Sequence, residues 1–468
     1  MYFKTFLLLA ISARIALAKV QFLGVAIAGG DFGCQIDGSC PLSSAQLPLS
    51  SDGVAQIQHF VKDDSVNILR LPISWQFLVN NQLGGNLDST NLAKYDQLVQ
   101  ACLATGAHCM IDIHNFARWN GGIIGQGGPT DDQFVSLWKQ LATKYAGTQN
   151  VVFELMNEPH DLDVGVWANT LQKVVTAIRE AGATSQMILL PGTNFDSAAT
   201  LATSGGAEQL LDIKNPDGTT NNLLLDIHKY LDEDNSGTHT QCTTDNTDAF
   251  TSVAQFLREK GRKGFISETG ASKDASCLTA FCAQNTLINK NADVFVGLVG
   301  WGAGSFDTSY IMSLTPSKQN GRLVDNQLMT QCLLSTWNDS EDSGSKDPEP
   351  STSSLPGVLF STFYSTETPP TMSATKTAQS SEPIITLAID SDTSVLQTAS
   401  LPPSLTTLIT AAGTPGDEPY SIALANPTTA SVPTQTQAKA SPTPTGSASS
   451  ARAALLLTWG CMLLSLSL

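Results

Sequence analysis

The segment Val151-Val152-Phe153-Glu154-Leu155-Met156 is a short, almost continuously apolar run, and it leads directly into Asn157-Glu158-Pro159. A continuous apolar run of this length is typical of a strand buried on both faces, as in a parallel sheet. The sequence therefore predicts eight buried strands, because seven further runs of the same kind lie between residues 20 and 338. They are Phe22 to Ala28, Val66 to Ile73, Cys109 to His114, Met187 to Leu190, Leu223 to Ile227, Gly264 to Ser267 and Val294 to Val299.

Helical patterns lie between these runs. They cover Asn91 to Ala104, Asp131 to Tyr145, Val166 to Ala181, Ala249 to Lys260 and Leu278 to Asn289. Strand alternating with helix eight times over about 320 residues predicts a (β/α)8 TIM barrel of the α/β class. A doubly wound open sheet is the alternative, but the Gly-rich turn at residues 28–31 lacks the G-x-G-x-x-G spacing.

Six of the predicted strands end in polar or aromatic side chains. In a barrel of this type, functional side chains lie at the carboxyl ends of the strands. Each residue alone has an ordinary structural explanation, such as a core histidine or an ion-paired arginine. Together they indicate a site, because an unsatisfied buried polar group costs roughly 1 to 3 kcal/mol. The residues are Arg70, His114, Asn157, Glu158, His228, Tyr230, Glu268 and Trp301.

Glu158 and Glu268 end the fourth and seventh strands, so we expect them to face each other across the mouth of the barrel. Two such carboxyl groups cleave glycosidic bonds: one protonates the leaving oxygen, while the other attacks the anomeric carbon or activates water. We expect Asn157 to donate to a sugar 2-hydroxyl, and Tyr230 and Arg70 to hold Glu268 ionised. Flat faces for pyranose rings are expected from Trp301, Trp119 and Trp75.

Three other carboxyl groups are expected to be structural. Glu154 shares the inward parity of Glu158, but four residues along a strand would put it roughly 13 Å deeper in the barrel. Asp112 and Asp226 each lie two residues before a histidine at the rim, so they too are expected to point inward.

With these motifs the sequence resembles glycoside hydrolase family 5, in particular the fungal endo-β-1,4-glucanases. The resemblance rests on Asn157-Glu158-Pro159 and on Ser267-Glu268-Thr269-Gly270, and it covers about residues 20 to 338. It implies a retaining mechanism without a cofactor, with Glu158 as acid/base and Glu268 as nucleophile. It also implies a −1 subsite lined by Arg70, His114, Asn157, His228, Tyr230 and Trp301.

The same resemblance implies a disulfide pairing, namely Cys34 with Cys40, Cys102 with Cys109, Cys242 with Cys277 and Cys282 with Cys332. The chain departs from some relatives because neither end carries a small Cys-rich cellulose-binding module. We therefore do not expect strong adsorption to crystalline cellulose.

Composition limits the partners and the compartment. The chain has 25 Lys and Arg against 42 Asp and Glu, a formal net charge of −17, which argues against nucleic acid as a partner. Of nine cysteines, only Cys461 lies in the C-terminal tail, and the remaining eight make four disulfides the expectation for a secreted protein. No cysteine pair has the C-x-x-C spacing of a zinc site, so we expect no metal.

Both ends read as targeting signals around a catalytic domain at residues 19–338. Residues 1–18 have the pattern of a secretory signal peptide, with a buried helix as the alternative.

Residues 339–446 hold 14 of the 22 prolines and 38 Ser and Thr, which indicates a disordered, O-glycosylated stalk. Residues 447–468 resemble a GPI-attachment signal with Gly446 as the lipidated residue, with a single membrane span as the alternative. Asn338, in Asn338-Asp339-Ser340, is the expected N-glycosylation site.

The sequence therefore predicts a secreted, surface-anchored, monomeric retaining endo-β-1,4-glucanase that acts on β-glucan. One alternative is a family 5 hydrolase or transglycosylase that acts on mannan or β-1,3-glucan in cell-wall remodelling. Another is a wall protein that binds glycan without cleaving it, and the presence of both glutamates argues against it.

Overall fold

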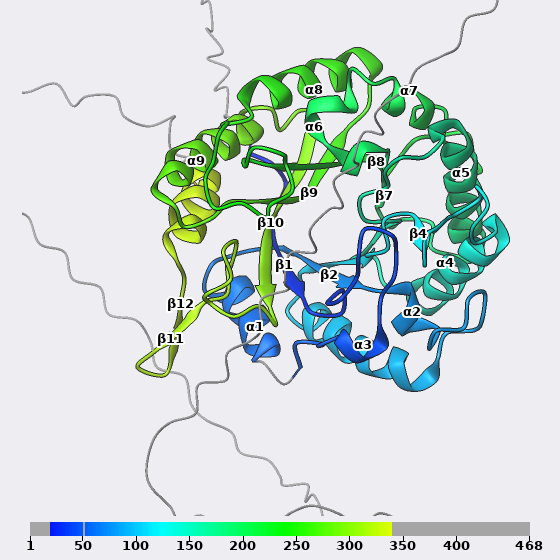
Figure 1. Cartoon of the computed structure of the whole chain (residues 1–468), viewed down its shortest axis with the longest axis horizontal. Coiled ribbons are helices and arrows are strands. Elements are labelled where there is room, and N and C mark those ends of the chain that lie inside the picture. Colours follow the sequence, from blue (N-terminus) through cyan, green and yellow to red (C-terminus); the bar gives the residue numbers. More distant parts are fainter. Residues whose placement is uncertain (1–18, 50–51, 339–468) are drawn as a thin grey trace, which may run out of the picture. The chain divides into compact units, whose positions relative to one another are not determined.

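The computed structural model describes residues 19–49 and 52–338, and these form a closed barrel of eight parallel strands. The strand order around the barrel is β1-β10-β9-β8-β7-β6-β3-β2, and helices form an outer ring around it (Figure 1). The predicted (β/α)8 fold is confirmed. The strands are β1 Phe22–Ala28, β2 Ile68–Ile73, β3 His108–Ile113, β6 Val151–Glu154, β7 Ile188–Leu190, β8 Leu223–Tyr230, β9 Gly264–Gly270 and β10 Phe295–Gly304.

The five predicted helices are present, with ends within three residues of those expected. Four of them start with a side-chain cap: Asp88, Asp163 and Asp274 accept backbone amides, and Thr130 forms a capping box with Gln133. The remaining helices were not predicted, and several of them are only one turn long. The helices are α1 Gly53–Lys62, α2 Trp75–Leu78, α3 Ser89–Leu103, α4 Asp131–Tyr145, α5 Val164–Glu180, α6 Ala198–Leu201, α7 Gly206–Leu210, α8 Thr247–Lys260 and α9 Ala275–Lys290.

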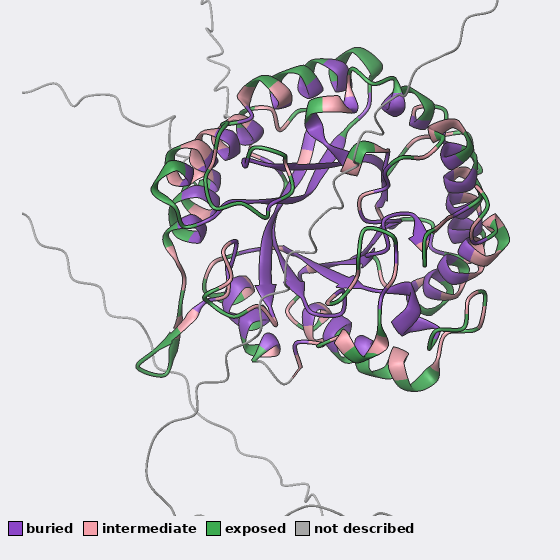
Figure 2. Cartoon of the chain, viewed as in Figure 1, coloured by how far each residue is buried: buried purple, intermediate pink, exposed green. Residues whose placement is uncertain are grey.

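The barrel interior is built in layers. Its lower layer is apolar and includes Phe22, Ile68, Met110, Val152, Leu224 and Phe265. Two residues further along five of these strands, the side chains that point into the barrel are polar. They are Arg70 on β2, Asp112 on β3, Glu154 on β6, Asp226 on β8 and Ser267 on β9, and all five are fully buried. Figure 2 shows the strands as buried and the outer faces of the helices as exposed.

The chain after β10 returns over the outside of the barrel. It forms the hairpin β11 Ser317–Gln319 and β12 Arg322–Val324, and then a π-helix at Leu328–Ser335. A second hairpin, β4 Arg118–Trp119 with β5 Gly122–Ile123, follows β3. The last residues of the barrel region are tied to its first, because the Trp337 indole donates to the Val20 carbonyl at 2.9 Å.

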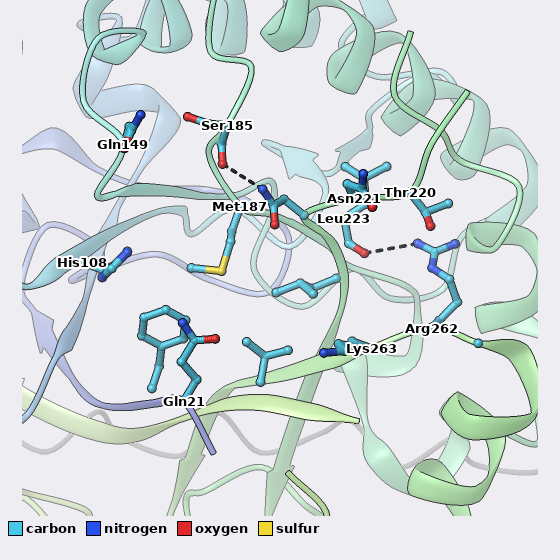
Figure 3. A pocket seen from close by; sticks show the side chains of 15 residues that line it. Gln21, His108, Gln149, Ser185, Met187, Thr220, Asn221, Leu223, Arg262 and Lys263 are labelled. Atoms are coloured by element: carbon cyan, nitrogen blue, oxygen red, sulfur yellow. Dashed lines mark hydrogen bonds between the residues drawn. The ribbon is translucent and has the colours of Figure 1, made fainter. Parts of the chain in front are cut away.

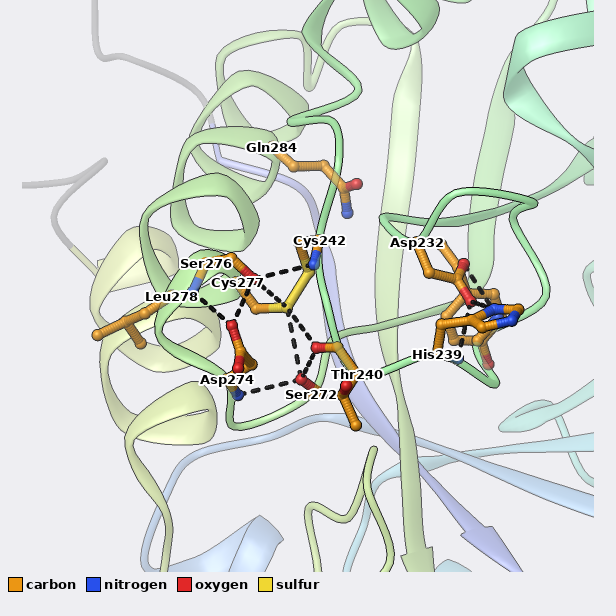
Figure 4. Close-up of a disulfide and its surroundings, with 12 residues drawn as sticks. Asp232, His239, Thr240, Cys242, Ser272, Asp274, Ser276, Cys277, Leu278 and Gln284 are labelled. Carbon is orange, nitrogen blue, oxygen red and sulfur yellow. Dashed lines mark hydrogen bonds and ion pairs between the residues drawn. A yellow bond between two sulfur atoms is a disulfide. The ribbon is translucent and has the colours of Figure 1, made fainter.

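Four disulfides join the eight cysteines of the described residues in the pairing that the family resemblance implied. Two are local, and two hold elements together across longer separations: Cys242–Cys277 joins the segment after β8 to α9 (Figure 4), and Cys282–Cys332 joins α9 to the π-helix. The local pairs are Cys34–Cys40 and Cys102–Cys109.

Several sequence predictions fall outside the described residues: the signal peptide 1–18, the stalk 339–446, Gly446 and the tail 447–468. Asn338, the expected glycosylation site, is the last described residue and is exposed. Among the described residues, no helix has the length and apolar character needed to cross a bilayer.

These contacts predict where the chain can be shortened. A variant that ends at residue 338 keeps Trp337 and Cys332, so it should unfold at the temperature of the full secreted chain and contain no free thiol by Ellman titration in denaturant. A variant that ends at residue 327 loses the π-helix and leaves Cys282 without its partner. Its thermal unfolding should therefore no longer be a cooperative transition. Equal stability of the two variants would contradict the role given to the π-helix.

Candidate active site

Arg70 is the centre of the polar layer beneath the rim. Its guanidinium is completely buried, and it binds Glu154 through two bonds, from Nε to Oε2 at 2.7 Å and from Nη2 to Oε1 at 2.5 Å. Nη2 also contacts Asp112 Oδ2 at 2.9 Å and donates to Asn157 Oδ1 at 2.8 Å, while Nη1 donates to Glu268 Oε2. One cation on β2 therefore holds residues from β3, β6, β9 and the segment after β6.

The pKa values of this layer follow from burial and from the charge of Arg70. Burial alone raises the pKa of a carboxyl group, but Arg70, with help from His228, lowers the pKa of Glu154 to about 2. At Asp112 the effect of burial is larger than the opposing effect of the positive charges of Arg70 and His114, so the pKa of Asp112 is raised to about 6. Burial and then the charge of Glu154 raise the pKa of Asp226 to about 8. Glu154 is therefore the ionised partner of Arg70.

The expectation that Glu154 lies roughly 13 Å below Glu158 is wrong. The strand β6 ends at Glu154, so the chain leaves the strand before it reaches Glu158, and the extended rise per residue does not apply. Glu154 instead lies directly beneath the rim, where Arg70 contacts both Glu154 and Glu268. Its structural role remains, because its carboxylate is completely buried against Arg70.

Glu268 reaches the site through a β-bulge in β9. Ile227 on β8 pairs with Ile266 and His228 pairs with Glu268, so Ser267 is an extra residue in the ladder. The Tyr230 hydroxyl donates to Glu268 Oε1 at 2.6 Å, and Arg70 donates to Oε2. Burial would raise the pKa of Glu268, but the charges of Arg70, His228 and His114 outweigh it and lower that pKa.

Glu158 follows β6 in a left-handed backbone conformation, with φ of 46°. This conformation is uncommon for a residue with a Cβ and is found at functional sites, where the surrounding structure holds it in place. The side chain is 18% exposed, and its Oε1 lies 2.9 Å from His228 Nδ1. Glu158 is thus open to solvent on one side and bonded to an imidazole on the other.

The two glutamates face each other, as the sequence predicted. A carboxylate oxygen of Glu158 lies within 4.8 Å of one of Glu268, and both lie within that distance of a ring nitrogen of His228. Arg70 and Tyr230 bind Glu268 alone, so the two carboxyl groups have different environments. One is held ionised, and the other is placed to exchange a proton.

Ser267 is part of the site and was not predicted as such. His228 Nε2 lies 3.0 Å from Ser267 Oγ, which in turn donates to Asp226 Oδ1. Burial lowers the pKa of an imidazole, but Glu154 and Glu158 raise that of His228 well above its usual value. Alternation along a regular strand would put Ser267 and Glu268 on opposite faces, so only the bulge brings both inward.

Asn157 has one satisfied and one free polar atom. Its Oδ1 accepts from Arg70, which fixes the orientation of the amide, and its Nδ2 is buried without a hydrogen-bond partner. A buried donor without a partner is costly unless a ligand completes it.

An aromatic wall stands beside the carboxyl groups. The Trp301 ring stacks on His114, with ring centroids 5.7 Å apart, and its Nε1 lies 3.3 Å from the Tyr310 hydroxyl. Phe306 and Tyr310, which stack at 4.1 Å, were not predicted, because they lie in the segment after β10 that has no strand or helix pattern. Asp112 holds His114 Nδ1 at 2.7 Å, and against the effect of burial it raises the pKa of His114 to about 9.

The prediction that Trp75 offers a face to a sugar is wrong. Trp75 begins α2, its side chain is completely buried, and it packs between Trp119 and Phe134 in the helix layer. Trp119 is partly exposed on β4 and stays a prediction.

A cavity of about 680 Å³ lies at the other end of the barrel, where the strands begin (Figure 3). Its polar side chains bond to their own surroundings: Asn222 donates to the Ser185 carbonyl at 2.9 Å, and Arg262 to the Leu223 carbonyl at 3.4 Å. Among the described residues, none that lines this cavity has a carboxyl group, so the cavity offers no counterpart of the Glu158 and Glu268 pair.

Comparison with known proteins agrees with this geometry. The family model for cellulase (glycosyl hydrolase family 5) matches residues 38–305. The chain is 54% identical over 323 residues to endoglucanase EG-II of Hypocrea jecorina, covering 67% of this chain and 77% of that protein. It is 44% identical over 298 residues to a manganese dependent endoglucanase Eg5A of Phanerodontia chrysosporium, covering 63% and 75%.

Solved structures show the same fold. The crystal structure of Cel5A (EG2) from Hypocrea jecorina matches with a TM-score of 0.67, covering 67% of this chain and 98% of that one. XacCel5A in complex with cellopentaose matches with a TM-score of 0.60 at 31% identity, covering 68% of this chain and 99% of that one.

The buried ion pairs predict a large effect of Arg70→Lys. Lysine cannot bind Glu154 through two parallel bonds and also reach Glu268, so buried carboxylates would lose their partner, and the free energy of unfolding should fall by about 3 kcal/mol or more. Arg258→Lys is the matched control, because Arg258 binds Asp293 through two bonds on the surface and should change stability by less than about 1 kcal/mol. Denaturant unfolding measures both, and equal effects would contradict the central role of Arg70.

Proposed function

The chain belongs to glycosyl hydrolase family 5 as a cellulase, and from this premise we propose that it is a retaining endo-β-1,4-glucanase in which Glu268 is the nucleophile and Glu158 the acid/base. The observation that carries the proposal is the asymmetric carboxylate pair, in which only Glu268 is bound by Arg70 and Tyr230. A nucleophile must be ionised, and the lowered pKa of Glu268 meets this requirement.

The spacing of the pair supports retention of configuration. Retaining glycosidases hold their carboxyl groups about 5 to 5.5 Å apart, and inverting ones about 6.5 to 9.5 Å apart to admit a water. A carboxylate oxygen of Glu158 lies within 4.8 Å of one of Glu268, which supports the closer, retaining arrangement.

The reaction then has two steps. Glu268 attacks the anomeric carbon while Glu158 gives its proton to the leaving glycosidic oxygen, which forms a glycosyl-enzyme and releases the first product. In the second step Glu158 takes a proton from water, the hydroxide oxygen bonds to the anomeric carbon, and Glu268 leaves as a carboxylate. His228 Nδ1, 2.9 Å from Glu158 Oε1, holds the carboxyl group of the acid/base in place through both steps.

Asn157 and the aromatic wall give the sugar its position. The free Nδ2 of Asn157 is a donor for the 2-hydroxyl, whose hydrogen bond strengthens as the oxocarbenium ion develops. Trp301, held by His114 and Tyr310, offers an apolar face for a pyranose ring.

Two observations support β-1,4-glucan as the substrate: the relatives include an endo-β-1,4-glucanase A, and the similar XacCel5A was solved in complex with cellopentaose. Activity of the purified enzyme should be highest on carboxymethyl-cellulose and mixed-linkage β-glucan, and low on mannan and laminarin. Mannan as the best substrate would overturn the substrate proposal and leave the two glutamates in place.

Glu158→Gln should lower kcat on a soluble β-1,4-glucan by roughly 10²- to 10⁴-fold, because the amide keeps the shape but cannot transfer a proton. Binding of a cello-oligosaccharide, measured by calorimetry, should change little. An aryl cellobioside with a good leaving group needs less protonation and should lose less in the first step. Glu259→Gln, on the exposed face of α8, is the control, and wild-type turnover in Glu158→Gln would refute the role of Glu158.

We also propose that the enzyme is secreted and held at the cell surface through a GPI anchor attached at or near Gly446. The support is the sequence alone: a signal-peptide pattern, and an apolar end preceded by small residues. Deletion of residues 453–468 should release active enzyme into the medium, as measured by glucanase activity in cells and supernatant. Retention of this variant on the cells would contradict a GPI signal.

A further inference from the structure

A histidine and three aspartates gather outside the barrel, where the β11–β12 hairpin lies beside α1 (Figure 1). His59 is on the last turn of α1, Asp63 caps that helix, and Asp64 follows. Asp325 comes directly after β12. These residues lie away from the carboxyl ends of the strands, so the reaction does not account for them.

The donor atoms of this cluster are spaced as ligands of one small cation are. His59 Nε2 lies 3.0 Å and 3.1 Å from the two oxygens of Asp325, and 3.5 Å from Asp64 Oδ2. Ligands that bind a metal at about 2.1 Å are separated by about 3.0 to 3.4 Å in octahedral or tetrahedral geometry.

Asp64 gives an independent indication of a missing ligand. Its side chain is only 10% exposed, and its Oδ2 is buried without a hydrogen-bond partner, although it faces His59 and Asp325. A carboxylate oxygen in this condition costs free energy unless a cation completes its coordination.

The other side of the imidazole is already arranged for metal binding. Asp63 Oδ2 lies 2.8 Å from His59 Nδ1. In the tautomer that carries its proton on Nδ1, Asp63 accepts that proton and the Nε2 lone pair is directed at Asp64 and Asp325. A carboxylate, a histidine and a metal in this order are the usual arrangement at metal sites. If His59 were instead the only cation, it would face three carboxylates with a single positive charge.

We propose that His59 Nε2, Asp64 and Asp325 bind one divalent cation of the Mn²⁺ or Zn²⁺ class, with Asp63 orienting the histidine. One imidazole nitrogen with carboxylate oxygens suits these ions. The cation joins the last turn of α1 to the end of the hairpin, while the Lys318–Asp52 ion pair at 2.5 Å joins the start of α1 to β11. The sequence expectation of no metal considered only cysteine spacing.

A second acidic cluster serves as the comparison. Asp232, Asp234 and His239 also lie close together, and Figure 4 shows Asp232 beside His239. Asp232, however, already accepts the backbone amides of residues 237, 238 and 239. Asp234 and His239 are exposed. This cluster organises its own loop and has no buried oxygen in need of a partner.

The test uses the full secreted chain, stripped of metal with EDTA and titrated with MnCl2 and, in a separate experiment, with ZnCl2. Calorimetry should find one saturable Mn²⁺ per chain, the free Mn²⁺ signal in electron paramagnetic resonance should fall in step, and the melting temperature should rise by several degrees. Asp325→Asn should abolish all three responses, and Asp63→Asn should weaken binding by about 10- to 100-fold. Asp234→Asn and Glu158→Gln are the controls and should bind as the wild type does.

Absence of saturable binding of both Mn²⁺ and Zn²⁺ to the wild type would overturn the proposal. The proposal would also be overturned if the Asp325→Asn variant still bound the cation. It would equally be overturned if Glu158→Gln abolished binding, since the cation would then lie at the glutamate pair. If Asp325→Asn does not fold, Asp64→Asn decides by the same readouts.

Discussion

The buried guanidinium of Arg70 is the interaction on which the rest of the site depends. A cation in the middle of a barrel is costly, because water no longer solvates it, and it is tolerated only with paired, well-oriented anions. Glu154, Asp112 and Glu268 supply those anions from three other strands. The negative charge of the nucleophile, Glu268, therefore also helps to neutralise the buried cation that holds these strands together. The apolar layer below and the rim above can differ in chemistry because this ionic layer separates them.

The catalytic geometry arises where the chain departs from regular strands. β6 stops at Glu154, and the left-handed residue Glu158 turns its carboxyl toward the mouth. The bulge at Ser267 puts two consecutive residues of β9 inside the barrel, so that Glu268 meets Arg70 and Ser267 meets His228. Both departures bring groups from distant strands within hydrogen-bonding reach, which a uniform ladder could not do.

Local pattern was enough to predict the eight strands, the five long helices and the residues of the rim. Strands buried on both faces appear in the sequence as continuous apolar runs, and the rim residues appear as polar side chains at the ends of these runs. The two errors have different causes. Glu154 was placed too deep because the argument extended regular strand geometry past the point where β6 ends. Trp75 was placed at the site from its residue type alone, although it begins α2 and is completely buried. Ser267, Phe306 and Tyr310 were missed because a bulge and an irregular segment bring them to the site, and neither has a periodic signature. His59 and Asp325 are 266 residues apart, and only the fold shows that they meet.

The central claim is that Glu268, held ionised by Arg70, attacks the sugar directly while Glu158 transfers the proton. The stereochemistry of the first product tests this most directly, because a displacement by the enzyme followed by one by water retains configuration, whereas a single attack by water inverts it. Proton NMR that follows hydrolysis of a cello-oligosaccharide from its first minutes measures the anomer before mutarotation. The account predicts that the β-anomer appears first and the α-anomer only later, and initial formation of the α-anomer would contradict it.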